Sequence, residues 1–154
     1  MSARMTSVLI LDDHDAIRES LMAFFEDRGW EVFAAETAEE ALELLGEEHP
    51  DGVTVDIRLP GMNGYDCLRA MVDSGKNLPC VIITGSPEFH LPDDVAAMPN
   101  IDANVFVKPV SDMQLLELAL LKKIEDCKGE IRGAGGIVFE EWILSGLSGS
   151  TSKN

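Results

Sequence analysis

The chain has 154 residues, 45% of them apolar, and a formal charge of −16 from 28 acidic and 12 basic residues. This length and apolar content suit one domain with a buried core, and no run approaches the roughly 18–20 apolar residues of a membrane span. Residues 1–126 carry all of the net charge, because acids and bases balance from Cys127 onward, and such an acidic surface excludes direct nucleic-acid binding as an expected function.

Five short apolar runs alternate with helical patterns along the chain. Four of the five are almost continuously apolar, which is typical of parallel strands covered on both faces. The predicted strands are residues 7–11, 31–35, 52–56, 80–84 and 104–108.

Capping residues and glycines bound most of the predicted helices. Residues 16–28 form an amphipathic pattern that ends at Gly29, and Thr37 to Glu40 reads as a capping box that opens a helix ending at Gly46. A third helix is expected over residues 65–73. Three prolines between residues 87 and 99 predict only a short or distorted helix at 93–98.

The last predicted helix follows the fifth strand. Ser111 to Gln114 reads as a second capping box, and the apolar positions assigned to this helix are Leu115, Leu118, Ala119 and Leu121. Residues 127–136 are glycine-rich and are expected to be a linker within a C-terminal extension, 126–154, that is rich in glycine and serine and carries a short apolar segment at 137–144. This extension is too short for a winged-helix output domain.

Alternating strands and helices predict an α/β fold with an open parallel sheet. The expected architecture is a flavodoxin-like, doubly wound, five-stranded sheet of order 2-1-3-4-5. Ligands of such sheets bind beyond the carboxyl ends of the strands, where the strand order reverses. Asp12 and Asp13 close the first strand, Asp56 the third, Thr84 the fourth and Lys108 the fifth. We therefore expect these five side chains to converge.

Three carboxylates in one cleft repel one another by roughly 4 kcal/mol per pair at about 4 Å and an effective dielectric near 20. A hard cation such as Mg²⁺ would relieve that repulsion and would also neutralise a transferred phosphoryl group. Lys108 and Thr84 suit phosphoryl oxygens. Asp56, on the central strand and followed by a constrained turn, is the expected nucleophile that forms an acyl phosphate.

These motifs resemble the receiver domain of two-component response regulators over about residues 6–125. The resemblance rests on the acidic pair Asp12–Asp13, the run from Asp56 to Gly64 (Asp-Ile-Arg-Leu-Pro-Gly-Met-Asn-Gly), Thr84 after an apolar strand, and Lys108–Pro109 after the last strand. Each motif is weak alone, but together and in this order they are specific.

The resemblance implies that Asp56 accepts a phosphoryl group from a histidine kinase or a histidine phosphotransfer protein. It implies a metal site for Mg²⁺, or alternatively Mn²⁺, formed by Asp12, Asp13, Asp56 and the backbone carbonyl of Arg58. It implies that Thr84 and Lys108 bind phosphoryl oxygens, and that the peptide bond before Pro109 is cis. The chain would be a cytoplasmic phosphoacceptor switch and not an enzyme.

The output is expected through contacts with a downstream protein, including homodimerisation through the face of the fourth helix, last strand and last helix. In this family an aromatic switch residue usually precedes the lysine by three positions, which is Val105 here, whereas Phe106 points to the opposite face. The departure motivates an alternative: an interaction module whose output is independent of phosphate.

A phosphatase with an aspartyl-phosphate intermediate is a third alternative. It would need an acid two residues after the nucleophile, and that position is Arg58. The three cysteines show no disulfide or zinc spacing and suit a reducing compartment. The histidines show no metal-ligand spacing either, so His14, beside the acidic pair, is interpreted as an exposed residue at a helix start.

Overall fold

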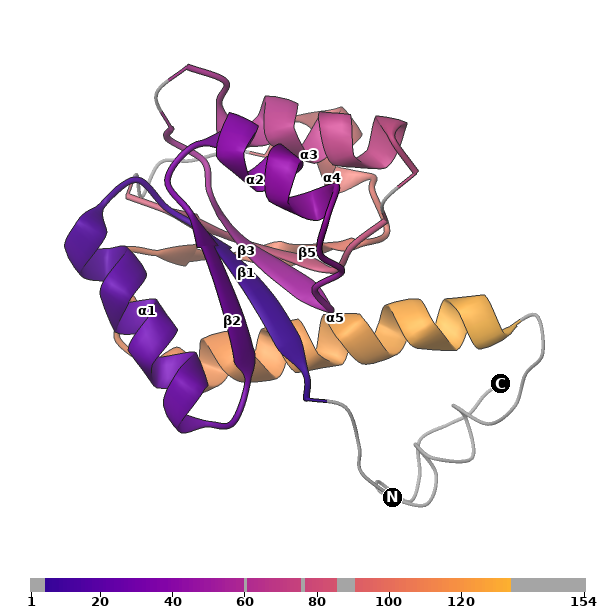
Figure 1. Ribbon diagram of the computed structural model, residues 1–154. Helices are drawn as coiled ribbons and strands as arrows, with labels where there is room; N and C mark the ends of the chain where they lie inside the picture. Colours follow the sequence, from indigo (N-terminus) through magenta and orange to yellow (C-terminus); the bar gives the residue numbers. More distant parts are fainter. Residues whose placement is uncertain (1–4, 60, 76, 86–90, 134–154) are drawn as a thin grey trace.

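The computed structural model describes residues 5–59, 61–75, 77–85 and 91–133. Five parallel strands form one sheet in the order β2-β1-β3-β4-β5, which confirms the predicted flavodoxin-like topology (Figure 1). The strands are β1 (Ser7–Leu11), β2 (Glu31–Ala35), β3 (Gly52–Asp56), β4 (Cys80–Thr84) and β5 (Ile101–Val107).

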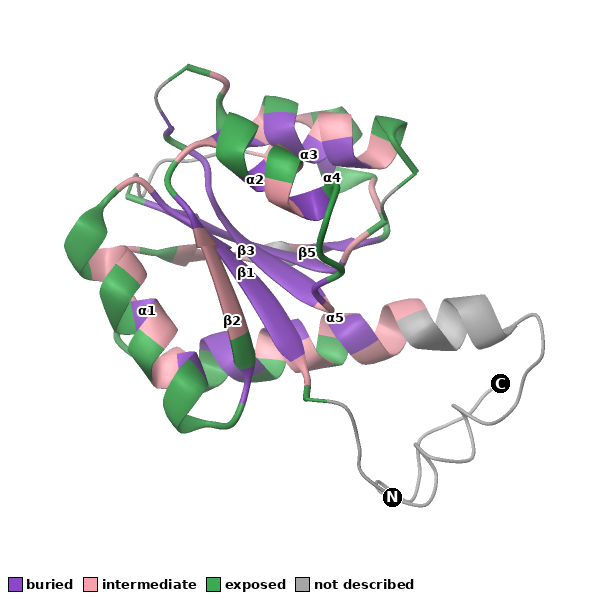
Figure 2. Cartoon of the chain, viewed as in Figure 1, coloured by how far each residue is buried: buried purple, intermediate pink, exposed green. Residues whose placement is uncertain are grey.

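Helices cover both faces of the sheet (Figure 1). One face carries α1 (Asp15–Asp27) and α5 (Met113–Gly133), and the other carries α2 (Ala38–Leu45), α3 (Gly64–Asp73) and α4 (Asp93–Ala96). Figure 2 shows buried residues along the central strands and exposed residues on the outer sides of the helices. Within the described residues, no helix combines the length and apolarity needed to cross a bilayer.

The alternation of side chains along β1 divides the core in two. Leu9 and Leu11 pack with α2, α3 and α4, whereas Val8 and Ile10 pack with α1 and α5. All four side chains are buried, which explains why β1 reads as a continuous apolar run and not as an alternating one.

The predicted caps are confirmed for α2 and revised for α5. Thr37 Oγ1 accepts the backbone N–H of Glu40 at 3.1 Å. For α5, however, Asp112 Oδ1 accepts the N–H of Leu115 at 3.2 Å and the helix begins at Met113. The predicted cap at Ser111 is therefore wrong by one residue, because the aspartate beside it satisfies the free backbone donor instead.

The buried stripe of α5 is formed by residues other than the four apolar positions named from the sequence. Leu116, Leu120 and Ile124 are buried, at the i, i+4, i+8 spacing of one helix face. Of the apolar positions named from the sequence, Leu115 and Leu118 are 54% and 58% exposed. Leucines lie on both sides of this segment, so its sequence alone does not show which side faces the core.

Two element boundaries also need correction. β5 begins at Ile101, three residues before its predicted start, and ends at Val107. The α5 helix continues to Gly133, so residues 127–133 are helical and not the expected linker. The apolar segment 137–144 lies outside the described residues, and the boundary of the extension at residue 126 stays a prediction.

Two sets of hydrogen bonds between polar side chains join neighbouring helices. Glu117 on α5 is buried and accepts hydrogen bonds from Arg28 Nε at 2.9 Å and from the indole N–H of Trp30 at 2.8 Å, which ties the end of α1 to α5. On the opposite face, Arg69 of α3 donates two hydrogen bonds to the carboxylate of Asp94 on α4, at 2.7 and 3.0 Å.

Gly64, at the start of α3, lies against the segment that follows Asp56. A Cβ atom there would come within 2.7 Å of the Asp56 carbonyl oxygen and 2.7 Å of Ile57 Cα. Its N–H donates to the Ile57 carbonyl at 3.0 Å, and Asn63 caps the helix by accepting the N–H of Asp66 at 2.9 Å. The absence of a side chain therefore allows α3 to hold the end of β3 closely.

We predict that Gly64→Ala destabilises the protein, because the added methyl meets backbone that cannot rotate away. A loss of about 1–3 kcal/mol in the free energy of unfolding is expected from overpacking, measured by urea denaturation. Gly85→Ala is the matched control, since a Cβ there meets no heavy atom of the described residues within 4 Å and its backbone does not lie in the left-handed region. Equal stability of the two variants would contradict this role of Gly64.

Candidate functional site

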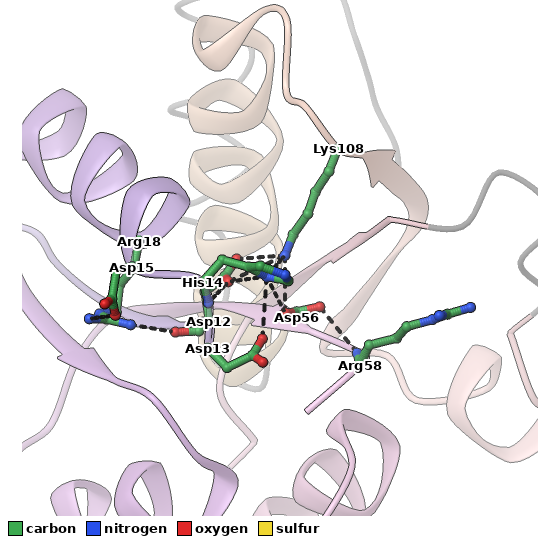
Figure 3. A network of polar contacts seen from close by, with 8 residues as sticks. All are labelled: Asp12, Asp13, His14, Asp15, Arg18, Asp56, Arg58 and Lys108. Atoms are coloured by element: carbon green, nitrogen blue, oxygen red, sulfur yellow. Dashed lines mark hydrogen bonds and ion pairs between the residues drawn. The ribbon is translucent and has the colours of Figure 1, made fainter. Parts of the chain in front are cut away.

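The carboxyl ends of three strands bring the predicted polar residues together. Asp12 directly follows β1, Asp56 is the last residue of β3, and Lys108 directly follows β5. Because β1 lies between β2 and β3, the strand order reverses beside Asp12 and Asp56, where ligands of open α/β sheets bind. Figure 3 shows the three side chains pointing toward one another.

Lys108 lies between the two buried aspartates. Its Nζ is 3.0 Å from Asp56 Oδ2 and 3.0 Å from Asp12 Oδ2, and it donates to Asp12 Oδ1 at 3.2 Å. Asp12 and Asp56 are each only 1% exposed. Two carboxylates this deep in the protein need a positive partner, and the Lys108 ammonium supplies it.

Burial raises the pKa of Asp56 from 3.8 to about 6, and the neighbouring Asp12 charge adds to the rise. The hydrogen bond from Lys108 and the backbone N–H of Arg58, which donates to Asp56 Oδ1 at 3.1 Å, act in the opposite direction. Desolvation is the largest of these effects. The folded protein therefore resists ionisation of the residue expected to be the nucleophile.

Asp13 and His14 complete the acidic cluster. His14 Nδ1 lies 3.3 Å from Asp12 Oδ1 and 3.4 Å from Asp13 Oδ1. The expectation that His14 is exposed at the start of α1 is confirmed, because its side chain is 58% exposed and it occupies the N-cap position. No histidine shows metal-ligand spacing along the sequence, but the fold places His14 Nδ1 3.9 Å from Asp56 Oδ2 of another strand, in a group of side chains that could hold a metal ion.

Arg18 is a site residue that sequence reasoning missed. Its Nη1 donates to the backbone carbonyl of Asp12 at 3.0 Å, and its Nη2 pairs with Asp15 at 2.7 Å. The guanidinium thus links the first turn of α1 to the turn that presents Asp12. Its position, one helical turn after His14, was the only sequence signal that could have suggested this contact.

The remaining predicted residues lie around this cluster. Thr84 ends β4, is buried, and follows Ile83, which pairs with Asp56 in the sheet. The guanidinium of Arg58 points away from the carboxylates (Figure 3), and the metal-binding role of its carbonyl stays a prediction. The Lys108–Pro109 peptide bond is cis, as predicted. Val105 packs with the α2–α4 side of the core and Phe106 with the α1–α5 side, which confirms that they face opposite ways.

The donor set fits a divalent metal ion. One ligand atom each from Asp12, Asp13, His14 and Asp56 lie within 4.8 Å of one another. Within the described part of the chain, Asp12 Oδ2 and Asp13 Oδ1 are buried and accept no hydrogen bond of good geometry. Their nearest cationic or imidazole nitrogens are Lys108 Nζ, 3.0 Å from Asp12 Oδ2, and His14 Nδ1, 3.4 Å from Asp13 Oδ1. Carboxylate oxygens with unused lone pairs are the ligands that Mg²⁺ prefers.

The raised pKa of Asp56 predicts that Asp56→Asn stabilises the metal-free protein at neutral pH. In the unfolded chain this carboxyl ionises near pH 3.8, whereas the folded protein delays ionisation to about pH 6. The native carboxyl therefore lowers the free energy of unfolding progressively across that interval. Urea denaturation in EDTA at pH 7.5 and pH 4 should show a stabilised variant at pH 7.5 and a smaller difference at pH 4. A difference that does not change with pH would contradict the shift.

Comparisons with known proteins agree with this geometry. The family model "Response regulator receiver domain" matches residues 8–120. The chain is 35% identical over 118 residues to the sensory/regulatory protein RpfC of Xanthomonas campestris pv. campestris, a match that covers 74% of this chain and 16% of RpfC. It is 31% identical to the transcriptional regulatory protein AfsQ1 of Streptomyces coelicolor, covering 97% of this chain and 64% of AfsQ1. The chain thus spans less than two thirds of either relative.

Solved structures show the same fold. A CheY-like response regulator receiver domain protein from Methanospirillum hungatei superposes with a TM-score of 0.70 at 28% identity, covering 82% of this chain and 99% of that one. The response regulator TrrA from Thermotoga maritima, solved in complex with Mg²⁺ and BeF, superposes with a TM-score of 0.65 at 28% identity, covering 78% and 99%. The chain therefore belongs to the response regulator receiver domain family of two-component systems.

Proposed function

We propose that the chain is a phosphoacceptor switch in which Asp56 takes a phosphoryl group from the phosphohistidine of a histidine kinase or a histidine phosphotransfer protein. The observation that carries this proposal is the position of Lys108, whose ammonium contacts both buried aspartates at 3.0 Å. A buried nucleophile with a cation beside it, at the ligand-binding edge of an α/β sheet, suits acceptance of an anionic group.

In the proposed reaction a carboxylate oxygen of Asp56 attacks phosphorus and forms an acyl phosphate. The phosphorus–nitrogen bond of the donor breaks, and its electron pair leaves with the donor imidazole. Asp12, Asp13, Asp56 and the Arg58 carbonyl would hold a Mg²⁺ ion, which would supply charge neutralisation at the phosphoryl oxygens. The complex of TrrA with Mg²⁺ and BeF supports Mg²⁺ as the metal ion of this site. Mn²⁺ is the alternative, because it prefers the same oxygen ligands.

Lys108 is proposed to change partners during this step. Before phosphorylation it neutralises Asp12 and Asp56. Afterwards Asp56 is joined to phosphorus through the oxygen of a mixed anhydride and the phosphoryl group carries the negative charge, so the ammonium is attracted to the phosphoryl oxygens. Thr84, at the neighbouring strand end, would donate its hydroxyl to the same group.

The output is proposed to occur through protein contacts on β5 and α5. Val107 at the end of β5 is 44% exposed, and Leu115 and Leu118 are exposed on α5. Exposed apolar side chains that are three residues apart on a helix share one face. This surface suits a downstream protein or a second copy of the chain. The net charge of −16 disfavours nucleic acid as the target.

A phosphate-independent interaction module is the second candidate, and the packing of Val105 favours it. Val105 is partly buried and packs with the α2–α4 side of the core, so no aromatic ring at this position couples Thr84 to the surface. Under this candidate, Asp56→Ala would retain full binding to the downstream partner. Under the leading proposal the same variant would lose the phosphorylation-dependent part of that binding.

We predict that acetyl phosphate with Mg²⁺ adds one phosphoryl group to the wild-type chain and none to Asp56→Asn. Intact-protein mass spectrometry measures the added mass, and EDTA should abolish it in the wild type because the carboxylate repulsion is then not relieved. Asp73→Asn, at the exposed end of α3, is the matched control and should be modified like the wild type. Modification of Asp56→Asn would overturn the assignment of the nucleophile.

A further inference from the structure

One ring nitrogen of His14 faces all three aspartates of the site. Besides its contacts with Asp12 and Asp13, His14 Nδ1 lies 3.9 Å from Asp56 Oδ2. The imidazole thus approaches the cluster from the rim while Lys108 approaches from above it (Figure 3). An exposed histidine with no role beyond solubility does not need to place its Nδ1 atom beside three carboxylates, as His14 does.

The same nitrogen lies 3.2 Å from Lys108 Nζ. An ammonium group can only donate hydrogen bonds, so this contact is favourable when Nδ1 carries its lone pair and the ring proton is on Nε2. In that tautomer Nδ1 accepts from the Lys108 ammonium and cannot donate to the carboxylate oxygens. Nδ1 and the oxygens of Asp12 and Asp56 therefore share one cationic partner, and a divalent ion held by the same atoms would take over that role.

The distances fit a shared ion. Two atoms bound to one ion at about 2.1 Å lie at most about 4.2 Å apart, and the contacts of Nδ1 with Asp12, Asp13 and Asp56 are 3.3, 3.4 and 3.9 Å. All four ligand atoms of the cluster lie within 4.8 Å of one another. A small movement of one side chain would bring the whole set within reach of one ion.

The backbone places the imidazole at this rim. The N–H of His14 donates to Asp12 Oδ1 at 2.8 Å, and residue 14 is extended as the N-cap of α1. The contact of Arg18 with the Asp12 carbonyl holds the same turn. The ring therefore reaches the cluster from a turn that is fixed at two points.

We propose that His14 Nδ1 is a further ligand of the divalent metal ion in this site and that it shifts the preference of the site from Mg²⁺ toward later first-row ions such as Co²⁺ and Zn²⁺. The inference rests on the proposed metal-dependent phosphoacceptor site. Imidazole nitrogen is a preferred ligand of these ions, whereas Mg²⁺ prefers oxygen ligands and keeps several waters. A nitrogen ligand therefore strengthens the binding of Co²⁺ and Zn²⁺ much more than the binding of Mg²⁺.

Isothermal titration of the full chain with Mg²⁺, Co²⁺ or Zn²⁺ alone tests this inference. We expect the wild type to bind Co²⁺ at least about ten-fold more tightly than Mg²⁺, and we expect His14→Ala to reduce that ratio about ten-fold or more, since a nitrogen ligand is lost. His49→Ala is the matched control, because His49 is exposed and distant in sequence from the site, and its ratio should equal that of the wild type. An unchanged ratio in His14→Ala would overturn the inference.

A second measurement reports the bond itself. In ¹⁵N-labelled protein, Zn²⁺ should shift the Nδ1 resonance of His14, and Asp13→Ala should weaken that shift because the ion loses a neighbouring ligand. A shift at Nε2, or none at saturating Zn²⁺, would overturn the inference even if affinities changed. His14→Gln, which offers an amide oxygen instead, should keep the reduced Co²⁺ to Mg²⁺ ratio of His14→Ala.

The two levels of proposal fail differently. If no divalent ion binds and acetyl phosphate leaves Asp56 unmodified, the proposed function fails. If Mg²⁺ binds and Asp56 is phosphorylated while His14→Ala keeps the wild-type ratio, only the role of His14 fails.

Discussion

The concentration of negative charge at one edge of the sheet is the constraint on which the site depends. Parallel strands that end together place Asp12 and Asp56 within reach of one ammonium, and both carboxylates are buried. Desolvation at this depth disfavours ionisation, as the raised pKa of Asp56 shows. The folded state therefore contains a local arrangement that is unfavourable by itself. Lys108 offsets part of that cost. A metal ion and an added phosphoryl group are the ligands that would most change the electrostatic free energy of the buried carboxylates.

Short-range contacts of neighbouring residues hold Asp12 and Asp56 in place despite the repulsion between their carboxylates. Gly64 lets α3 approach the backbone that follows Asp56, and Arg18 fixes the carbonyl of Asp12 from the first turns of α1. Both contacts involve backbone atoms of the site, so the carboxylate oxygens stay available to bind a ligand. The large apolar clusters on the two faces supply the general stability, so the site tolerates unfavourable electrostatics that a smaller core would not.

Much of the fold could be predicted because fully buried parallel strands read as continuous apolar runs, and the polar residue that ends each run marks the ligand-binding edge. The start of β5 was missed because Asp102 interrupts its apolar pattern. The sequence does not show the inward face of α5, because leucines occupy both of its sides. The cap was misassigned to Ser111 because the neighbouring Asp112 accepts the free N–H instead. The grouping of His14 with the aspartates could not be read from spacing along the chain, because such spacing detects ligands of one element, whereas this cluster joins the residues after β1 to the last residue of β3.

The ion pair between Arg69 and Asp94 makes the stability of the face that carries α4 depend on salt. This helix has only four residues, too few for internal hydrogen bonds to define its orientation. Its position depends on buried Val95 and on a bidentate ion pair at the surface. Dissolved ions screen exposed pairs, with a Debye length of about 8 Å at 0.15 M ionic strength. The stability of this face should therefore vary with ionic strength, whereas the α1–α5 face, joined through buried Glu117, should be much less sensitive to salt.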